Sequence, residues 1–257
     1  SYLYCQGLRL HLEKARIKHP NDSKFIKEVM DNVYMDDTIF GSNSLPEARH
    51  RIQLMFDIFQ KAHFPLKKWS TNSPQLSEFI QEISPVKDPV ITSGVTDAKF
   101  LGVAWNQQTD RLSTPTTKAL KELATGTPTK RKLLRGVASI FDCFGVLAPI
   151  CMNAKILFQK LWKDKIGWDT PLEGTNLALY EAFHKLLNES SDLSIARLLS
   201  PSQNPKEIHV FCDASKLSYG CVAYLREQLN ESVVNVSFFI AKGRVAPVRP
   251  MSIQRLE

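Results

Sequence analysis

Residues 32–41 of the chain read NVYMDDTIFG and place two adjacent acids between two short runs of β-prone residues. This pattern predicts a β-hairpin with Asp36 and Asp37 at its turn. Two neighbouring carboxylates repel each other unless a cation offsets their charge, and Mg²⁺ binds one or two carboxylates together with substrate phosphates. Because Asp is also common in solvated turns, the pair alone indicates either a metal site for phosphoryl transfer or an ordinary surface turn.

The sequence around this hairpin alternates between helical and extended patterns. A helical pattern covers residues 7–30, and Ser44 with Glu47 forms the start signal of another helix after the hairpin. Residues 64–69 and 99–105 are predicted strands, separated by a Ser- and Pro-rich loop. The helix after Ser44 is expected to bury one face, which consists of Ile52, Met55, Phe56 and Phe59.

From about residue 113 the pattern changes to helices and then returns to strands. One predicted helix follows Thr129, and two others cover residues 153–163 and 177–187. The apolar residues at helical spacing in the first of them are Leu133, Leu134, Val137, Ile140 and Phe141. After a polar linker, three strands are predicted at residues 208–213, 218–225 and 233–240. This succession predicts an α+β fold.

The charge of the chain is concentrated in the helical middle. The whole chain has 257 residues and a net charge of +7, and residues 113–170 contain ten Lys and Arg against four Asp and Glu. A surplus of cations favours a polyanionic partner such as nucleic acid, although a merely basic soluble protein would show the same balance.

The sequence also restricts the cellular setting that we expect. No run approaches the roughly 20 apolar residues that a membrane span needs, and no signal-peptide pattern begins the chain. The cysteines lack CxxC spacing, so we expect reduced, buried thiols in an intracellular protein that is not secreted and has no membrane partner. They are Cys5, Cys143, Cys151, Cys212 and Cys221.

Residues 34–37, YMDD, resemble the catalytic hairpin of reverse transcriptases, whose motif is Tyr-x-Asp-Asp. From about residue 8 onward, the order and spacing of several blocks are similar to those of BEL/Pao retrotransposon reverse transcriptases. These blocks are FPLKKWSTNS (64–73), KFLGVAW (99–105), TKR (129–131), SIFD (139–142), GVLAP (145–149), AKIL (154–157) and LW (161–162). The combination is far more specific than the acid pair alone.

The resemblance implies an RNA-directed DNA polymerase that acts on a primer–template and dNTPs. Asp36 and Asp37 would be catalytic and would hold Mg²⁺ or Mn²⁺ in a two-metal site. Tyr34 and Met35 would contact the primer–template beside them. The hairpin Phe100-Leu101-Gly102 would be the primer grip, which holds the primer end against the metal site.

The basic helical middle would then be the thumb of the polymerase. Arg131, Lys132 and Arg135 are expected to point away from the apolar face of their helix, toward the phosphates of a bound duplex. Lys130 falls nearer the apolar face, but its long stem could still reach outward to the same phosphates. A solvated helix face would show the same pattern.

Residues 211–215, FCDAS, and 219–224, YGCVAY, resemble the opening hairpin of ribonuclease H, whose first catalytic Asp lies on strand one. The resemblance implies that Asp213 is a metal ligand for two-metal hydrolysis of the RNA strand of a hybrid. In the family the second acid opens a helix after the third strand, and Glu257 stands in that place.

The implied organisation is a palm remnant at residues 1–112, a helical thumb and connection at 113–205, and the start of a ribonuclease H sheet at 206–257. We expect both ends to be cut from a longer polyprotein, whose other parts would be partners in a cytoplasmic particle or the nucleus. The polymerases of this class need three carboxylates and ribonuclease H needs four acids, of which the sequence has two each. Residues 1–7 also depart from the family's pattern. We therefore expect that this polypeptide alone catalyses neither reaction at a useful rate.

Three readings follow from the sequence. The chain is a piece of a reverse transcriptase with ribonuclease H, complete only in a longer parent, or it is a non-catalytic nucleic-acid-binding remnant in which the thumb supplies the affinity. The third reading is a basic scaffold whose Asp36-Asp37 pair is a surface turn.

Overall fold

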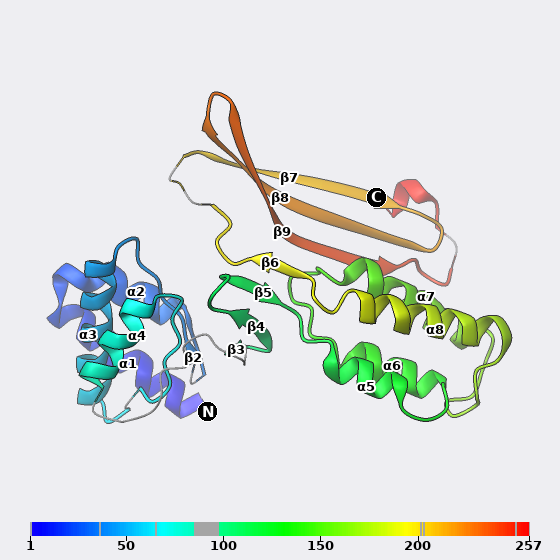
Figure 1. Ribbon diagram of the computed structural model, residues 1–257, viewed down its shortest axis with the longest axis horizontal. Helices are drawn as coiled ribbons and strands as arrows, with labels where there is room; N and C mark the ends of the chain where they lie inside the picture. Colours follow the sequence, from blue (N-terminus) through cyan, green and yellow to red (C-terminus); the bar gives the residue numbers. More distant parts are fainter. Residues whose placement is uncertain are drawn as a thin grey trace. The chain divides into compact units, whose positions relative to one another are not determined.

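The computed structural model shows a chain that folds into two compact units, Ser1–Ala98 and Lys99–Glu257 (Figure 1). Helices and antiparallel strands both contribute, so the predicted α+β class is confirmed. Within the described part of the chain, no helix has the length and apolar character that a membrane crossing requires. The structure describes residues 2–35, 37–64, 66–84, 98–200, 202, 204–249 and 251–256.

The described residues of the first unit are mainly helical and include a short hairpin. Helices α1, α2 and α3 supply its main core, in which Leu12, Ile26 and Met55 are almost completely buried. The elements are α1 (Tyr2–Lys18), η1 (Pro20–Asp22), α2 (Ser23–Asp31), β1 (Val33–Tyr34), β2 (Asp37–Thr38), α3 (Leu45–Lys61) and α4 (Pro74–Ile83).

Helix α3 confirms the prediction made from its start signal and its apolar spacing. The side chain of Ser44 accepts a hydrogen bond from the Glu47 amide at 3.4 Å, and the Glu47 carboxylate accepts one from the Asn43 amide at 3.1 Å. These bonds satisfy amides that the first turn of a helix leaves unpaired. The four residues of the predicted apolar face, Ile52, Met55, Phe56 and Phe59, are all buried.

Two predictions that follow α3 are wrong. Residue 64 and residues 66–69 are irregular rather than a strand, because their apolar side chains pack onto the helices, as where Trp69 stacks on Phe56 at 4.9 Å between ring centroids. Part of the expected loop is helix α4. Ser73 and Pro74, which suggested a loop, are the cap and first residue of this helix, and Ser73 accepts a hydrogen bond from the Leu76 amide at 3.4 Å.

In its described residues, the second unit combines two antiparallel sheets with four α-helices and one short 3-10 helix. One sheet has the strand order β3-β4-β5-β6, and the other has the order β7-β8-β9. The strands are β3 (Ala98–Phe100), β4 (Val103–Asn106), β5 (Arg111–Ser113), β6 (Ser194–Ala196), β7 (Lys206–Ala214), β8 (Ser218–Asn230) and β9 (Val233–Val245). The helices are α5 (Thr117–Ala124), α6 (Lys130–Ala138), α7 (Ala148–Lys163), α8 (Gly174–Glu189) and the short η2 (Ile253–Arg255).

Helices α5 to α8 surround one apolar core. The helices predicted after Thr129 and at residues 153–163 and 177–187 correspond to α6, α7 and α8, whereas α5 was not predicted. Leu133 of α6, Leu161 of α7 and Phe183 of α8 are at most 1% exposed. The predicted apolar face of α6 is only partly correct. The helix ends at Ala138, so Ile140 and Phe141 lie beyond it, and Leu134 and Phe141 are exposed at their surface.

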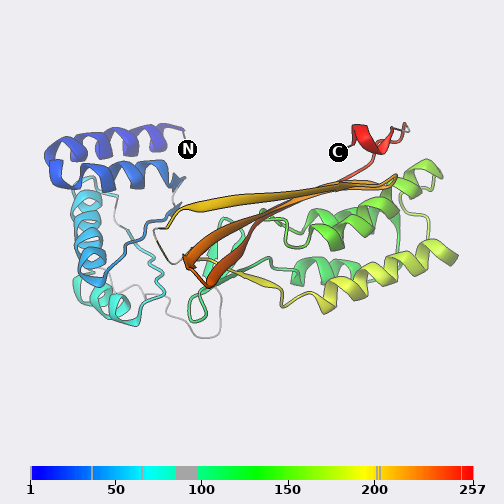
Figure 2. The same ribbon diagram turned by 90° about the horizontal axis from the view of Figure 1, so that it is seen from above.

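The β7–β9 sheet is a long twisted ribbon whose strands extend past the predicted ones (Figure 2). β7 lies at one edge of this sheet. Its apolar side chains Ile208, Val210 and Phe211 are 61%, 59% and 59% exposed. β9 lies at the other edge, next to α7 (Figure 1).

The junction of α7 and β9 depends on a glycine before the helix. The Ala241 amide of β9 donates to the Phe144 carbonyl at 2.8 Å, which extends the sheet by one backbone contact. Gly145 has φ of 78°, and a Cβ atom there would collide with the Ala241 carbonyl oxygen. Only glycine suits both this backbone conformation and this close approach.

Candidate functional site

Asp213 lies near the end of β7 in a row of residues that are aligned across the three-stranded sheet. It is paired with Gly220 of β8, and Gly220 is paired with Gly243 of β9. Paired residues project from the same face of a sheet, so the Asp213 carboxylate stands beside two positions that have no side chain. The residue is exposed, and its Oδ1 accepts a hydrogen bond from the Ala214 amide at 2.9 Å. The row leaves space for a ligand next to the carboxylate.

Helix α7 packs against this same face of the sheet, at the opposite edge from Asp213. A Cβ atom at Gly243 would come within 2.7 Å of the Met152 Cε atom, so the face that carries Gly243 is the face that α7 covers. The Gln159 side chain, two turns further along the helix, donates to the Ala246 carbonyl at 2.7 Å. Asp213 therefore lies on the open part of a face that α7 bounds.

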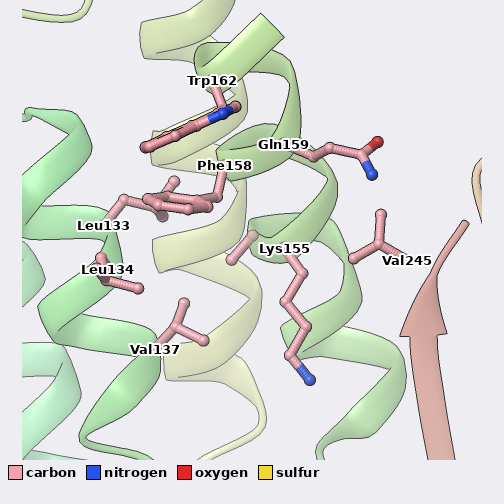
Figure 3. A pocket seen from close by; sticks show the side chains of 9 residues that line it. Leu133, Leu134, Val137, Lys155, Phe158, Gln159, Trp162 and Val245 are labelled. Atoms are coloured by element: carbon pink, nitrogen blue, oxygen red, sulfur yellow. The ribbon is translucent and has the colours of Figure 1, made fainter. Parts of the chain in front are cut away.

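Lys155 lies between these two α7 contacts and is a candidate that the sequence did not single out. It lines, with Gln159 and Val245, a cavity of about 330 Å³ at the junction of α6, α7 and β9 (Figure 3). The cavity lining is almost wholly apolar, but the Lys155 amino group points away from the Phe158 and Trp162 rings (Figure 3). Lys155 is exposed and brings a positive charge to the helix side that faces the sheet.

The first unit holds the predicted acidic hairpin. Val33 pairs with Thr38 and Tyr34 with Asp37, so the two runs form the expected antiparallel hairpin. Tyr34 is 60% exposed and Asp37 is also exposed, while Met35 has φ of 57° in the connection. Asp36 lies outside the described residues. Tyr34 and Asp37, which are paired across the hairpin, are thus both accessible to solvent.

The predicted primer grip, Phe100-Leu101-Gly102, is a hairpin turn between β3 and β4. Leu101 and Gly102 both have positive φ, of 48° and 87°, which is the conformation of a tight type I′ turn. A Cβ atom at Gly102 would come within 2.9 Å of the Phe141 ring, so the turn packs closely on the segment after α6. Leu101 is 41% exposed. The predicted strand at 99–105 is therefore two strands with this turn between them.

Lys130 is buried, in contrast to the expectation that its stem would reach outward. It is only 4% exposed, and its ammonium group donates to the Ile166 carbonyl. The group also lies 5.1 Å from the centre of the Trp162 ring and 4.9 Å from that of Trp168. Two aromatic faces and a carbonyl compensate for its lost hydration, so Lys130 ties the start of α6 to the end of α7.

The other predicted thumb cations lie at the surface, and two of them have acidic partners. Arg131 forms a two-bond pair with Asp169 at 2.7 and 2.8 Å, and this hydrogen bonding raises the pKa of Arg131 and lowers the pKa of Asp169. Arg135 lies 3.8 Å from Glu122, and Lys132 is half-buried. Exposed pairs of this kind contribute little to stability, so a phosphate can compete for the same cations.

The linker before β7 is fixed to the sheet by a buried carboxylate. Glu227 of β8 accepts hydrogen bonds from the hydroxyl groups of Ser202 and Ser200, the latter at 2.8 Å. These bonds, the Ser202 bond foremost, hold the pKa of Glu227 below its ordinary value. The Leu199 carbonyl accepts a hydrogen bond from Ser237 of β9 at 2.7 Å. Leu199, Ser200 and Ser202, which precede the strand that carries Asp213, are therefore hydrogen-bonded to β8 and β9.

The donor set around Asp213 fits part of a magnesium site. An exposed carboxylate on a strand, with open space beside it, suits an ion that keeps several waters and takes phosphate oxygens as ligands. Glu257, the predicted second ligand, lies outside the described residues. Among the residues that the structure does describe, no three His, Cys, Asp or Glu side chains gather closely enough to hold a metal ion. Of the four predicted metal ligands, the structure therefore describes two, which are Asp37 in the first unit and Asp213 in the second.

The expectation of five buried thiols is wrong for three of them. Cys143, Cys212 and Cys221 are exposed, and Cys151 alone is buried. Burial raises the pKa of Cys151 to about 11. Cys212 and Cys221 face each other across β7 and β8, which no spacing rule in the sequence reveals.

Comparison with known protein families gives one match. A family model described as the Pao retrotransposon-like RNaseH-like domain matches residues 129–257. The matched region starts at the N-cap residue of α6 and contains α6, α7, α8 and the whole β7–β9 sheet. No curated protein matches the chain. The predicted resemblance is confirmed for the ribonuclease H region of a Pao-type retrotransposon.

Proposed function

This chain belongs to the family of Pao retrotransposon-like RNaseH-like domains, and from that premise we propose that it binds the RNA–DNA hybrids of reverse transcription. Membership in a retrotransposon RNaseH-like family indicates a function that involves nucleic acid. The finer assignment is a segment of an RNA-directed DNA polymerase with ribonuclease H. The observation that carries the ribonuclease H part of this proposal is the Asp213 row, in which a single carboxylate stands beside two glycines on the open face of the sheet.

The lysine next to this face and the basic helix α6 support binding of a phosphate backbone. Helix α7 bounds the face that carries Asp213, and Lys155 is exposed on the side of α7 that contacts β9. Lys132 and Arg135 of α6 add positive charge to the same unit, on the side of α6 that faces Gly126 and the α5 residue Glu122. Phosphate contacts from Lys and Arg supply most of the sequence-independent affinity of nucleic-acid-binding proteins. A hybrid that lies along α6 and α7 would bring its backbone toward Asp213.

Asp213 and Glu257 are the residues that would hold Mg²⁺ or Mn²⁺ on this face. When bound, such ions activate water and stabilise the leaving oxygen in phosphodiester hydrolysis. The chain's own contribution is to hold the Asp213 carboxylate on an ordered strand, with Gly220 and Gly243 keeping the adjacent surface clear. One described carboxylate holds a metal weakly. We therefore expect the isolated chain to bind an RNA–DNA hybrid but to cleave its RNA strand at no useful rate.

The first unit and the β3–β4 turn carry the polymerase part of the proposal. The exposed hairpin with Tyr34, Met35 and Asp37 would contact the primer–template and dNTP, and Leu101-Gly102 would hold the primer. We expect no primer extension by the isolated chain in the presence of Mg²⁺ and dNTPs. Robust extension that is abolished by Asp36→Asn would show instead that the chain is a working polymerase.

Substituting Lys155 tests the nucleic-acid-binding proposal. Lys155→Gln should weaken binding to an RNA–DNA hybrid and reduce the slope of log K against log salt by about one, because one phosphate contact is lost. Fluorescence anisotropy with a labelled hybrid measures both quantities. Lys185→Gln is the matched control, since the Lys185 side chain is 78% exposed on α8 in the same unit. Equal slopes for the two variants would exclude Lys155 from the binding surface.

A further inference from the structure

Cys212 of β7 and Cys221 of β8 form a directly facing pair of exposed thiols. The Ser215 amide donates to the Ser218 carbonyl at 2.8 Å, so residues 215 and 218 are a hydrogen-bonded pair of the antiparallel ladder. Hydrogen-bonded and non-hydrogen-bonded pairs alternate along such a ladder. With the register of these strands, Asp213 and Gly220 are again a hydrogen-bonded pair, and Cys212 with Cys221 is a non-hydrogen-bonded pair.

This position in the ladder brings the two side chains close together. The Cα atoms of a non-hydrogen-bonded pair lie about 4.5 Å apart and their side chains are closer than in the alternate pairs. A disulfide requires Cα atoms between about 4.4 and 6.8 Å apart, so the backbone spacing is compatible with a bond. Because both residues project from the same face and both are exposed, neither strand has to move far for their sulfur atoms to meet.

The surroundings of the pair favour an anionic reagent. Cys221 is paired on its other side with Lys242 of β9, which is exposed, so the row across the sheet reads Cys212, Cys221 and Lys242. The next row on the same face ends at Arg244, which is paired with Tyr219. Positive charge beside a reactive group raises the local concentration of an anionic reactant. Glutathione disulfide, a small disulfide that carries several carboxylates, matches this environment.

We propose that Cys212 and Cys221 are a redox modification site that closes to a disulfide in reaction with glutathione disulfide. The thiolate of one cysteine attacks a sulfur of glutathione disulfide, which forms a mixed disulfide and releases one glutathione. The second cysteine then attacks the protein sulfur of that mixed disulfide and releases the second glutathione. The two cysteines are oxidised by two electrons in total, glutathione disulfide is reduced, and the two thiol protons pass to the two released glutathiones.

Closure would join β7 to β8 immediately before Asp213 in the sequence. Cys212 and Asp213 are neighbours along β7 and therefore project from opposite faces, and Cys221 of β8 projects from the same face as its partner Cys212. The bond would thus form on the face away from the proposed nucleic-acid surface. The modification site therefore stands independently of the proposed function. It would fix an edge strand that has β8 as its partner and whose apolar side chains are widely exposed.

Mass spectrometry of the full chain after incubation with glutathione disulfide tests this proposal. The wild-type chain should release two glutathiones, retain none at this site, and yield a peptide pair linked through Cys212 and Cys221. Cys212→Ser should retain one glutathione on Cys221, and Cys221→Ser should retain one on Cys212, because neither can complete the second step. Cys143→Ser, which removes an exposed thiol outside the sheet, should form the same linked pair as the wild type.

Two results would overturn the proposal. One is a wild-type chain that accumulates stable glutathione adducts on Cys212 or Cys221 without the linked peptide pair. The other is a wild-type chain in which both thiols remain unmodified while Cys143 reacts. Since both results are read from the wild-type chain, they do not depend on whether the single variants fold.

Discussion

Replacing Gly145 by alanine is expected to lower the free energy of unfolding of the second unit by at least about 3 kcal/mol. The residue has φ of 78°, a conformation that disfavours any side chain, and the new Cβ atom would collide with the Ala241 carbonyl oxygen. The variant must therefore either keep a strained backbone or move the start of α7 away from β9. Urea unfolding followed by near-ultraviolet circular dichroism measures the loss.

Gly174→Ala separates the two causes of that loss. Gly174 also has positive φ, of 51°, but a Cβ atom there would meet nothing within 4 Å. This control should lose only about 1–2 kcal/mol, which corresponds to the backbone strain alone. Equal losses for the two variants would show that the approach of α7 to β9 does not depend on Gly145.

Lys130→Ala is expected to destabilise the second unit by about 2–4 kcal/mol. The substitution removes the hydrogen bond to the Ile166 carbonyl and both aromatic contacts of the ammonium group, and it leaves a cavity between α6 and α7. Lys132→Ala, on the same helix but half-exposed, should change stability by no more than about 0.5 kcal/mol. Urea unfolding of the two variants under the same conditions measures the difference.

The same pair of variants distinguishes a structural lysine from one that contacts phosphate. Without urea, and at a low temperature at which both variants are folded, the Lys130→Ala variant should bind the RNA–DNA hybrid with the affinity of the wild type. A Lys130→Ala variant with unchanged stability and a weaker, less salt-dependent affinity for the hybrid would restore the role that the sequence suggested for it.

Local signals in the sequence were sufficient for much of the secondary structure. Ser44 and Glu47 mark the start of α3, and the spacing of Ile52, Met55 and Phe59 identifies its buried face, because capping and helical periodicity involve only neighbouring residues. The hairpin at residues 33–38 and the three strands of the last sheet were predicted for the same reason. Helix α4 was missed because Ser and Pro are signals both for loops and for helix starts.

The features that depend on distant contacts could not be predicted. Lys130 is buried by Trp162 and Trp168, which lie more than thirty positions away in the sequence. β5 pairs with β6, so that Leu112 is opposite Ile195, although four helices separate them in the chain. The exposure of Lys155, and the facing of Cys212 and Cys221, follow from strand register and helix packing. These are set by tertiary contacts rather than by local preference.

The candidate site was predicted in part. The sequence identified Asp213 through its resemblance to the opening hairpin of ribonuclease H, and the structure adds the open row with Gly220 and Gly243. The roles of Asp213 and of Asp37, and the division of the chain at residues 112 and 205, stay predictions. Asp36 and Glu257 lie outside the described residues.

The affinity of the wild-type chain for an RNA–DNA hybrid, measured as a function of salt concentration, tests the central claim most directly. If the second unit binds a phosphate backbone along α6, α7 and the Asp213 face, the logarithm of the association constant should fall linearly as the logarithm of the salt concentration rises. The slope should correspond to several phosphate contacts. The same binding should persist when divalent ions are chelated. An affinity that is undetectable at low salt, or one that does not change with salt, would contradict the proposal that this chain binds nucleic acid.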